Sequence, residues 1–261
     1  MIKGPRGKER IIVALDVSSL DKAGELIEKL APYVGLFKVG LELITAEGAP
    51  RVVKFVQERG GKIFFDGKFH DIPNTIGAAT RAVSALGVSM LNVHASSGID
   101  GMMAAVANAK SGSDIGGPEQ FRDTLVLAVT VLTSHEENEG HQIFGAPTKA
   151  KVLQMAKDAK LAGCDGIICS PQELKLLRSR RELKGLITVI PGTRSAGVAV
   201  GDQKRVMTPG EAVIDGADYL VAGRQVTKPE VGDPVEAAIK LCQEIEQAEK
   251  DMEEEEAKKL L

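Results

Sequence analysis

The feature that most constrains this sequence is a short apolar run that recurs eight times, usually followed by a segment with helical spacing. Short, nearly continuous apolar runs are typical of strands that are buried on both faces. The strands predicted in this way span residues 11–16, 35–40, 62–68, 89–94, 124–132, 166–170, 186–190 and 219–223. Helices are predicted over residues 20–30, 48–58, 98–109, 147–162 and 171–183, with two more beginning near residues 73 and 234.

Strands that alternate with helices form right-handed β-α-β units, so the predicted sheet is parallel. Eight such units in 261 residues fit an α/β fold of the (β/α)8 TIM-barrel class, which takes roughly 250 residues. No linker divides the chain, and we predict a single barrel domain over residues 1–242. An open doubly wound sheet is the alternative, because the number of strands does not prove closure.

The last residues, 243–261, are highly charged and include a run of glutamates at residues 253–256. We predict a charged C-terminal helical tail, either as a solvated continuation of the last helix or as a frayed end. An acidic tail that binds a partner is the less favoured alternative.

The composition excludes several kinds of partner. The formal net charge is −3 and there is no Trp, so neither a basic nucleic-acid surface nor a base-stacking platform is expected. No apolar run approaches the ~20 residues that span a bilayer, and the N-terminus lacks the apolar core of a signal peptide. Cys164, Cys169 and Cys242 have no Cys-x-x-Cys spacing and are typical of reduced thiols. We therefore expect a cytoplasmic protein with no membrane or nucleic-acid partner.

Charged side chains stand where three consecutive predicted strands end. Asp16 closes the first strand, Lys38 lies near the end of the second, and Asp66 and Lys68 close the third. The carboxyl ends of barrel strands share one rim, which carries the active site in barrel enzymes, so these residues are expected to meet there. Side chains alternate along a strand, so Asp66 and Lys68 should point the same way. A structural ion pair would explain an isolated Asp-x-Lys, but three neighbouring strands favour function.

Other polar residues lie close to the same predicted rim. Asp71 precedes the helix that begins near Pro73, where it could cap the helix. Thr133 follows the fifth strand and His94 ends the fourth. For His94 a structural role is at least as well supported as a functional one, and His70 is interpreted as structural for the same reason. Neither histidine has a partner at metal-ligand spacing, so no metal site is predicted.

A second group of residues follows the seventh and eighth predicted strands, where barrel enzymes often bind phosphate. The segment 191–197 reads Pro-Gly-Thr-Arg-Ser-Ala-Gly and leads into a loop that contains Gln203. Gly223 and Arg224 follow the eighth strand. Glycine lets backbone amides approach an anion, and an arginine fork can grip it. The alternative is a turn glycine beside a surface arginine, but the position favours phosphate.

The segment 66–75, which reads Asp-Gly-Lys-Phe-His-Asp-Ile-Pro-Asn-Thr, closely resembles the signature of the orotidine 5′-phosphate decarboxylase family. Weaker landmarks occur in the family's order at residues 15–16, 37–40, 129–134, 191–194 and 221–224. Gly67 departs mildly from the family pattern, in which a larger apolar residue is common there. Residues after about 243 lie outside the resemblance.

The resemblance implies a (β/α)8 barrel that converts orotidine 5′-monophosphate to uridine 5′-monophosphate and CO2, the last step of de novo pyrimidine nucleotide synthesis. It also implies a homodimer without a metal or organic cofactor. Lys68 would be the proton donor, and Asp66 would lie beside the departing carboxylate. Lys38 and Asp16 would hold the ribose hydroxyls and orient the charged group, and Asp71 would help to keep Lys68 charged.

The remaining roles implied by the resemblance concern the partner subunit, the base and the phosphate. Asp71 and Thr75 would reach into the partner's site, and Thr133, or alternatively Ser134, would contact the pyrimidine. The phosphate would be bound by Arg194, Gln203, Gly223 and Arg224, with the loop 197–205 closing over it.

Two other functions fit parts of the pattern. Related sugar-phosphate decarboxylases or aldolase-like barrels use a similar Asp-x-Lys-x-x-Asp and recruit Mg²⁺, but the continuation over residues 70–75 favours the pyrimidine substrate. A non-catalytic nucleotide-binding barrel would be expected to have a broken charged group, whereas Lys38, Asp66, Lys68 and Asp71 are all present.

Overall fold

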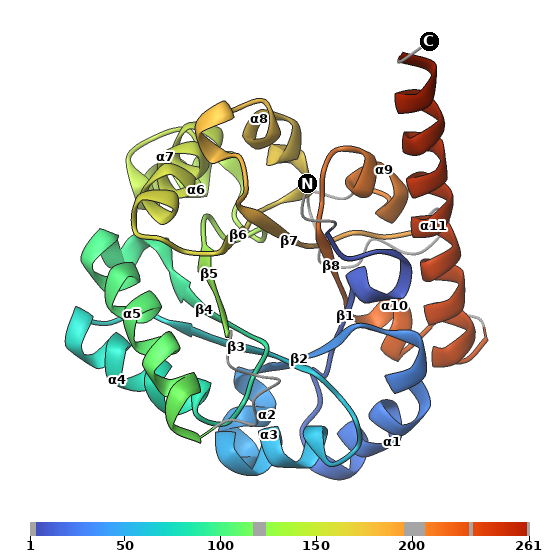
Figure 1. Cartoon of the computed structure of the whole chain (residues 1–261), viewed down its shortest axis with the longest axis horizontal. Helices are drawn as coiled ribbons and strands as arrows, with labels where there is room; N and C mark the ends of the chain where they lie inside the picture. The colour runs from blue at the N-terminus through green and yellow to red at the C-terminus, as the bar shows by residue number, and fades with distance from the viewer. Residues whose placement is uncertain (1–3, 117–123, 196–206, 230–231, 260–261) are drawn as a thin grey trace.

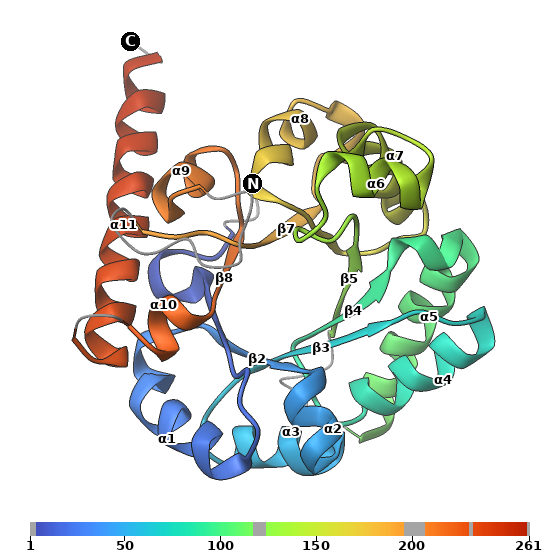
Figure 2. The ribbon, with the colours of Figure 1, turned by 180° about the vertical axis from the view of Figure 1, so that it is seen from behind.

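The computed structural model describes residues 4–116, 124–195, 207–229 and 232–259. Its strands are all parallel and pair in sequence order from β1 to β8, and β8 pairs with β1 to close the barrel (Figures 1 and 2). The strands are β1 Ile11–Ala14, β2 Leu36–Gly40, β3 Ile63–Phe69, β4 Met90–His94, β5 Leu125–Val129, β6 Gly166–Ile168, β7 Ile187–Pro191 and β8 Tyr219–Ala222. The predicted closed barrel is confirmed, and the open doubly wound sheet is excluded.

Helices surround the barrel on its outside (Figure 1). They are α1 Leu20–Leu30, α2 Leu41–Glu47, α3 Ala49–Gln57, α4 Pro73–Ser84, α5 Gly98–Gly116, α6 Glu137–Phe144, α7 Thr148–Leu161, α8 Leu174–Arg178, α9 Pro209–Ile214, α10 Arg224–Thr227 and α11 Pro234–Lys259. Four of them, α2, α6, α9 and α10, were not predicted from the sequence. All four have eight residues or fewer, so helical periodicity has little length in which to appear. No helix in the described part of the chain is both long and apolar enough to cross a membrane.

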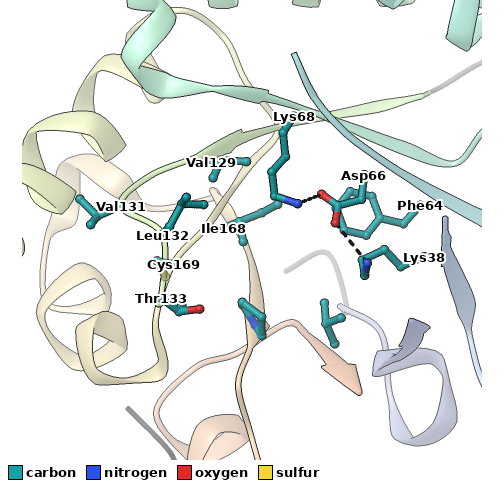
Figure 3. Close-up of a pocket in the computed structure, with 12 residues that line it drawn as sticks. Lys38, Phe64, Asp66, Lys68, Val129, Val131, Leu132, Thr133, Ile168 and Cys169 are labelled. Atoms are coloured by element: carbon teal, nitrogen blue, oxygen red, sulfur yellow. Dashed lines mark hydrogen bonds and ion pairs between the residues drawn. The ribbon is translucent and has the colours of Figure 1, made fainter. Parts of the chain in front are cut away.

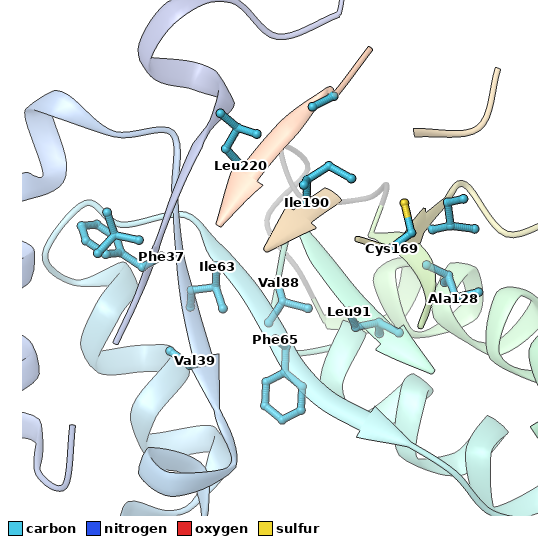
Figure 4. Packing of buried hydrophobic residues seen from close by; sticks show 14 of the residues in the cluster. Phe37, Val39, Ile63, Phe65, Val88, Leu91, Ala128, Cys169, Ile190 and Leu220 are labelled. Atoms are coloured by element: carbon cyan, nitrogen blue, oxygen red, sulfur yellow. The ribbon is translucent and has the colours of Figure 1, made fainter. Parts of the chain in front are cut away.

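Alternation along each strand divides the apolar residues into two clusters. The inner cluster fills the barrel with Ile12, Ala14, Leu36, Phe64, Met90, Leu127, Val189 and Val221. The outer cluster lies between strands and helices and includes Phe37, Val39, Phe65, Leu91 and Leu220 (Figure 4). Both faces of the strands are therefore covered, as expected for near-continuous apolar runs.

On the first four strands, the side chains that face the inside of the barrel change from apolar to polar toward the carboxyl end. Ala14, Leu36, Phe64 and Met90 belong to the inner cluster. Two residues after each of them, where the same face recurs, stand Asp16, Lys38, Asp66 and Asn92. The same alternation that fills the barrel with apolar side chains thus delivers a row of polar ones to its rim.

Strand β3 departs from regular geometry within this row. Its pairing with β4 passes from Phe65↔Leu91 to Phe69↔Val93, so β3 contains a bulge between these pairs. Lys68 lies inside the bulge and has φ 47°, the only positive φ of a non-glycine residue in the described ranges. The neighbouring Gly67 faces the outer cluster: a Cβ atom there would lie 2.7 Å from Cε1 of Phe65 and 3.3 Å from Cε1 of Phe69. A side chain at position 67 would therefore point away from Asp66 and Lys68.

The last helix, α11, runs without a break through residue 243 and along the outside of the barrel, and its C-terminal end extends beyond the ring (Figures 1 and 2). Ile245, Ala248 and Glu249 are buried on this helix. The Glu249 carboxylate accepts hydrogen bonds from Nε of Arg10 at 2.7 Å and from the backbone N–H of Gly7 at 3.3 Å. The first turns of the charged tail are thus packed on the N-terminal segment, whereas residues 253–258 are exposed.

Candidate active site

Four charged side chains of alternating sign lie in a row at the carboxyl ends of the first three strands. Nζ of Lys68 lies 2.6 Å from Oδ1 of Asp66, and Nζ of Lys38 lies 3.2 Å from Oδ2 of the same carboxylate. Lys38 also contacts Oδ1 of Asp16 at 2.9 Å. Asp66 therefore stands between two ammonium groups (Figure 3). The predicted meeting of these four residues on one rim is confirmed.

Burial and neighbouring charges shift the pKa values of Asp66 and Lys38 in opposite directions. Burial alone would raise the pKa of Asp66, but the charges of Lys38 and Lys68 and the hydrogen bonds from Lys68 and Asn92 outweigh it, so the pKa lies below its ordinary value. Burial alone would lower the pKa of Lys38, but the carboxylates of Asp66 and Asp16 outweigh it and the pKa is raised. Asp66 and Lys38 are thus both held in their charged forms at neutral pH.

The row borders a cavity of ≈ 180 Å³ inside the rim (Figure 3). Lys38, Asp66 and Lys68 form one side of it. The rest of the lining is mainly apolar and comes from Phe64 of β3, from β5 to β8 and from the segments that follow β5 and β6: Phe64, Val129, Val131, Leu132, Thr133, Ile168, Cys169, Pro191 and Val221. A charged wall that faces an apolar wall suits a flat ring that carries an ionised substituent. Thr133 lines this cavity, whereas Ser134 is exposed and does not.

The arginines of the second predicted group lie close enough to affect each other. Arg194 follows β7 and is only 8% exposed, and Arg224 begins α10 directly after β8. Burial lowers the pKa of Arg194, and the positive charge of Arg224 lowers it further. The two loops are joined by a hydrogen bond from the backbone N–H of Ser195 to Oε1 of Gln225, at 3.3 Å. Two neighbouring guanidinium groups form a favourable place for an anion.

Gly223 separates β8 from Arg224, and a Cβ atom there would meet nothing within 4 Å. Val221, two residues earlier, lines the cavity, as does Pro191 three residues before Arg194. The arginines therefore follow directly on strand ends that border the cavity. Gln203, which was predicted to join them, lies outside the described residues.

Asp71 and Thr75 are exposed and are not placed beside the row of charges in this chain. Asp71 accepts a hydrogen bond from the backbone N–H of the next residue, Ile72, at 2.7 Å. The side chain of Asp71 makes no hydrogen bond to the first turn of α4, so the expected helix cap is not formed. His70 and His94 stack edge to face with ring centroids 5.5 Å apart. Burial lowers the pKa of His94, and the charges of His70 and Lys68 lower it further.

Sequence reasoning missed two residues of this site. Asn92 is fully buried on β4, and its side chain contacts both Asp66 and the backbone of Lys68. A signal was available, because an amide flanked by apolar residues in a strand is costly to bury unless it is hydrogen-bonded. Gly40 ends β2, and a Cβ atom there would lie 3.1 Å from Nζ of Lys38 and 3.5 Å from Oδ1 of Asp16. Gly40 lies within the landmark at residues 37–40, but nothing in the sequence indicates its contact with the charged side chains.

Within the described ranges, no group of three or more His, Cys, Asp or Glu side chains is arranged to hold a metal ion. The chemistry of the rim itself is that of ammonium and carboxylate groups beside an apolar surface. Such a set can stabilise negative charge and transfer a proton.

Comparison with known proteins adds independent information. The model of the orotidine 5′-phosphate decarboxylase / HUMPS family matches residues 9–241. The chain is 45% identical to orotidine 5′-phosphate decarboxylase of Moorella thermoacetica over 242 residues, which cover 92% of this chain and 93% of that protein. It is 41% identical to the protein of the same name from Syntrophomonas wolfei, over 93% of this chain and 100% of that protein.

A solved structure supports the same relationship. The crystal structure of orotidine 5′-phosphate decarboxylase from Lactobacillus acidophilus is similar, with a TM-score of 0.76 and 34% sequence identity. The similarity covers 90% of this chain and 98% of that one.

Proposed function

Because the chain belongs to the orotidine 5′-phosphate decarboxylase / HUMPS family, we propose that it converts orotidine 5′-monophosphate to uridine 5′-monophosphate and CO2. This reaction is the last step of de novo UMP biosynthesis. One observation supports the proposal above all others. The Nζ atom of Lys68 and the carboxylate of Asp66 meet at 2.6 Å on the wall of a largely apolar cavity.

The proposed chemistry centres on Lys68. The bond between the pyrimidine ring and its carboxylate breaks, CO2 leaves, and the bonding electron pair stays on the ring carbon. The Lys68 ammonium stabilises this charge and then donates a proton to the carbon, which forms the new C–H bond. The neutral amine is reprotonated from solvent.

Asp66 aims the proton donor, because its carboxylate holds Nζ of Lys68 at 2.6 Å. Asp66 is itself held ionised by the charges of Lys38 and Lys68, which lower its pKa. In the bound complex, Asp66 lies beside the carboxylate that departs. Lys38 and Asp16 are assigned to the ribose hydroxyls, because their ion pair is at the outer end of the row, where Asp16 is 59% exposed.

The other end of the nucleotide is assigned to Arg194, Gly223 and Arg224, together with Gln203. The charge of Arg224 is close enough to lower the pKa of Arg194, and an anion bound beside the two arginines would offset this repulsion. Thr133, which lines the cavity, is assigned to the pyrimidine. Phosphate binding far from the reacting carbon supplies binding energy that orients the ring and closes the site.

A homodimer completes the proposed site. Asp71 and Thr75 lie on the surface of one protomer, where they can reach the site of its partner. Nearby, Ile72 is 66% exposed and Met103 is 52% exposed. Helices α4 and α5 also border a hollow of ≈ 580 Å³ that is lined largely by alanine, glycine and proline. Exposed apolar side chains beside a hollow of this size support burial against a second copy.

We place the enzyme in the cytoplasm. Its three cysteines are unpaired, and burial raises the pKa of Cys164 to about 12. Buried thiols of this kind are inert and are typical of proteins from a reducing compartment.

The direct test is the change in ultraviolet absorbance as orotidine 5′-monophosphate is consumed, measured with and without EDTA. We expect equal rates under both conditions, since the proposed site needs no metal. Loss of activity on chelation would point to a metal-dependent sugar-phosphate enzyme of the same family. Tight binding of the nucleotide without CO2 release would point to a non-catalytic binding protein.

A further inference from the structure

Asn92 occupies a position where an amide is expensive to bury. It is 0% exposed on β4, on the inner face that also carries Met90. Burying an unpaired amide costs several kcal/mol, so such a group persists only when its hydrogen bonds are made. The amide nitrogen and the amide oxygen of Asn92 are both hydrogen-bonded. Nδ2 donates to Oδ1 of Asp66 at 2.7 Å, and Oδ1 accepts the backbone N–H of Lys68, also at 2.7 Å.

These two hydrogen bonds span the bulge in β3. The pairing of β3 with β4 advances four residues on β3, from Phe65 to Phe69, but only two on β4, from Leu91 to Val93. The Asn92 side chain takes the place of the missing strand partner for the N–H of Lys68. A non-glycine residue with φ 47° is strained, because its Cβ atom crowds the backbone, and it needs such support.

We propose that Asn92 is the positioning residue for the proton donor. Its amide ties the backbone of Lys68 and the carboxylate of Asp66 into one unit, and this unit aims Nζ of Lys68 into the cavity. The inference rests on the proposed function, because it assigns a role within that reaction. Asn92 does not line the cavity and acts through its two neighbours.

Two substitutions at Asn92 test these hydrogen bonds: one removes both of them, and the other keeps the acceptor and replaces the donor. Asn92→Ala removes both, and we expect kcat to fall about 10²-fold, because a displacement of about 1 Å costs that much. Asn92→Asp keeps the acceptor for Lys68 but replaces the donor by a carboxylate that faces Asp66. Two carboxylates at this distance share one proton, so the pKa of the pair is raised. When the new carboxyl group is protonated, it can donate to Asp66 as the amide does.

A distinctive pH profile follows. For Asn92→Asp, kcat should rise as the pH is lowered from about 8 to about 5, over a range in which the wild-type kcat changes much less. If Asn92 had only a structural role, the substitution would lower stability without this rise in kcat at low pH. The dissociation constant of uridine 5′-monophosphate should change little in either variant, because the residues assigned to the phosphate are unchanged.

Thr124→Val is the matched control. Thr124 is buried, and its hydroxyl donates to the Val88 carbonyl at 2.8 Å, at the opposite end of the strands from the charged row. It should lose stability but keep the wild-type kcat and pH profile. Wild-type kcat with a wild-type pH profile in Asn92→Asp would overturn the inference.

Hydrogen exchange of the wild-type Lys68 amide gives a test that is independent of catalysis and of variant folding. We expect strong protection, and exchange at the rate of an open loop would also overturn the inference. If the wild-type chain fails to decarboxylate the nucleotide, the proposed function fails, whereas a protected Lys68 amide would still support the Asn92 bridge.

Discussion

The Nζ atom of Lys68 lies 2.6 Å from Oδ1 of Asp66, two residues earlier on the same strand. In a regular strand these two side chains would point the same way, and here they do so although the backbone between them is irregular. The ion pair survives the bulge because Asn92 holds both residues from the neighbouring strand. Lys68, the proposed proton donor, is therefore held by two side chains, Asp66 on its own strand and Asn92 on the neighbouring strand.

Lys68→Ala should leave a folded protein with decarboxylation nearly abolished. The loss should reach at least 10²–10⁴-fold in kcat, roughly the contribution of a positioned acid, since Lys38, the other ammonium on the cavity wall, is held by Asp16 and Asp66. Turnover is measured by absorbance, and folding by circular dichroism. Lys62→Ala removes an exposed lysine just before the same strand and should retain activity. Near-normal turnover by Lys68→Ala would remove Lys68 from the mechanism.

Mixing two inactive variants should restore activity if the site is shared between protomers. Lys68→Ala and Asp71→Ala dimers, dissociated and reassociated at equal concentration, should recover about a quarter of the wild-type rate, because half of the dimers are mixed and each of these has one intact site. The rate is compared with that of each variant treated alone. No recovery, despite exchange shown by native mass spectrometry, would place Asp71 in the site of its own protomer.

Arg224→Ala should lower kcat/KM for orotidine 5′-monophosphate by roughly 10–100-fold, the value of a charged hydrogen bond to phosphate. The loss should be much smaller for orotidine, which lacks the phosphate. Arg180→Ala, an exposed arginine on the loop after α8, serves as the control. Equal losses for the two substrates would exclude Arg224 from phosphate binding.

The row of charges predicts how stability depends on pH. The folded pKa of Asp66 is lowered, so its stabilising contribution is present above the ordinary pKa of 3.8 and is lost as the pH falls through the folded value. The folded pKa of Lys38 is raised, so its contribution is present below 10.5 and is lost as the pH rises through the higher folded value.

Lys38→Met should therefore move the acid-unfolding midpoint to higher pH, because the pKa of Asp66 rises when one ammonium is removed. The same variant should also lack the fall in the free energy of unfolding that deprotonation of Lys38 causes in the wild type at alkaline pH. Unfolding in urea at a series of pH values measures both effects. Lys54→Met, which changes a lysine side chain that is 77% exposed, should follow the wild-type curve.

Glu249→Ala should reduce the free energy of unfolding by about 3 kcal/mol, since it removes the carboxylate from a buried ion pair and leaves Arg10 with only backbone partners. Glu254→Ala, on the exposed part of the same helix, should have little effect. Urea unfolding gives the difference, and kcat at 25 °C should stay unchanged in both variants. Equal stabilities would mean that the tail is not held through Glu249.

The barrel could be predicted because its strands are buried on both faces and therefore stand out as apolar runs. Asp16, Lys38, Asp66 and Lys68 could be placed because each interrupts or ends such a run. The strand predicted over residues 124–132 ends three residues early, at Val129, because Thr130 to Leu132 curve into the loop that lines the cavity. Apolar residues facing a cavity look the same in sequence as those facing a core.

Other parts of the site follow from three-dimensional packing that a sequence does not display. The positive φ of Lys68 could not be foreseen, because lysine has no preference for that conformation. Gly40 owes its identity to the approach of the Lys38 ammonium from its own strand. Asp71 and Thr75 lie on the surface of a single chain, so the role proposed for them depends on a second protomer that the sequence does not display.

The two phenylalanines that flank Gly67 form a steric unit with it, since their rings, 6.1 Å apart, occupy the space that a larger residue would need. A Cβ atom at position 67 would force the Phe65 ring to move. Leucine there would first require a smaller or reoriented side chain at Phe65 or Phe69. Where relatives carry a bulky residue at this point, the three positions are expected to covary, and grafting one alone would shift the strand that carries Lys68.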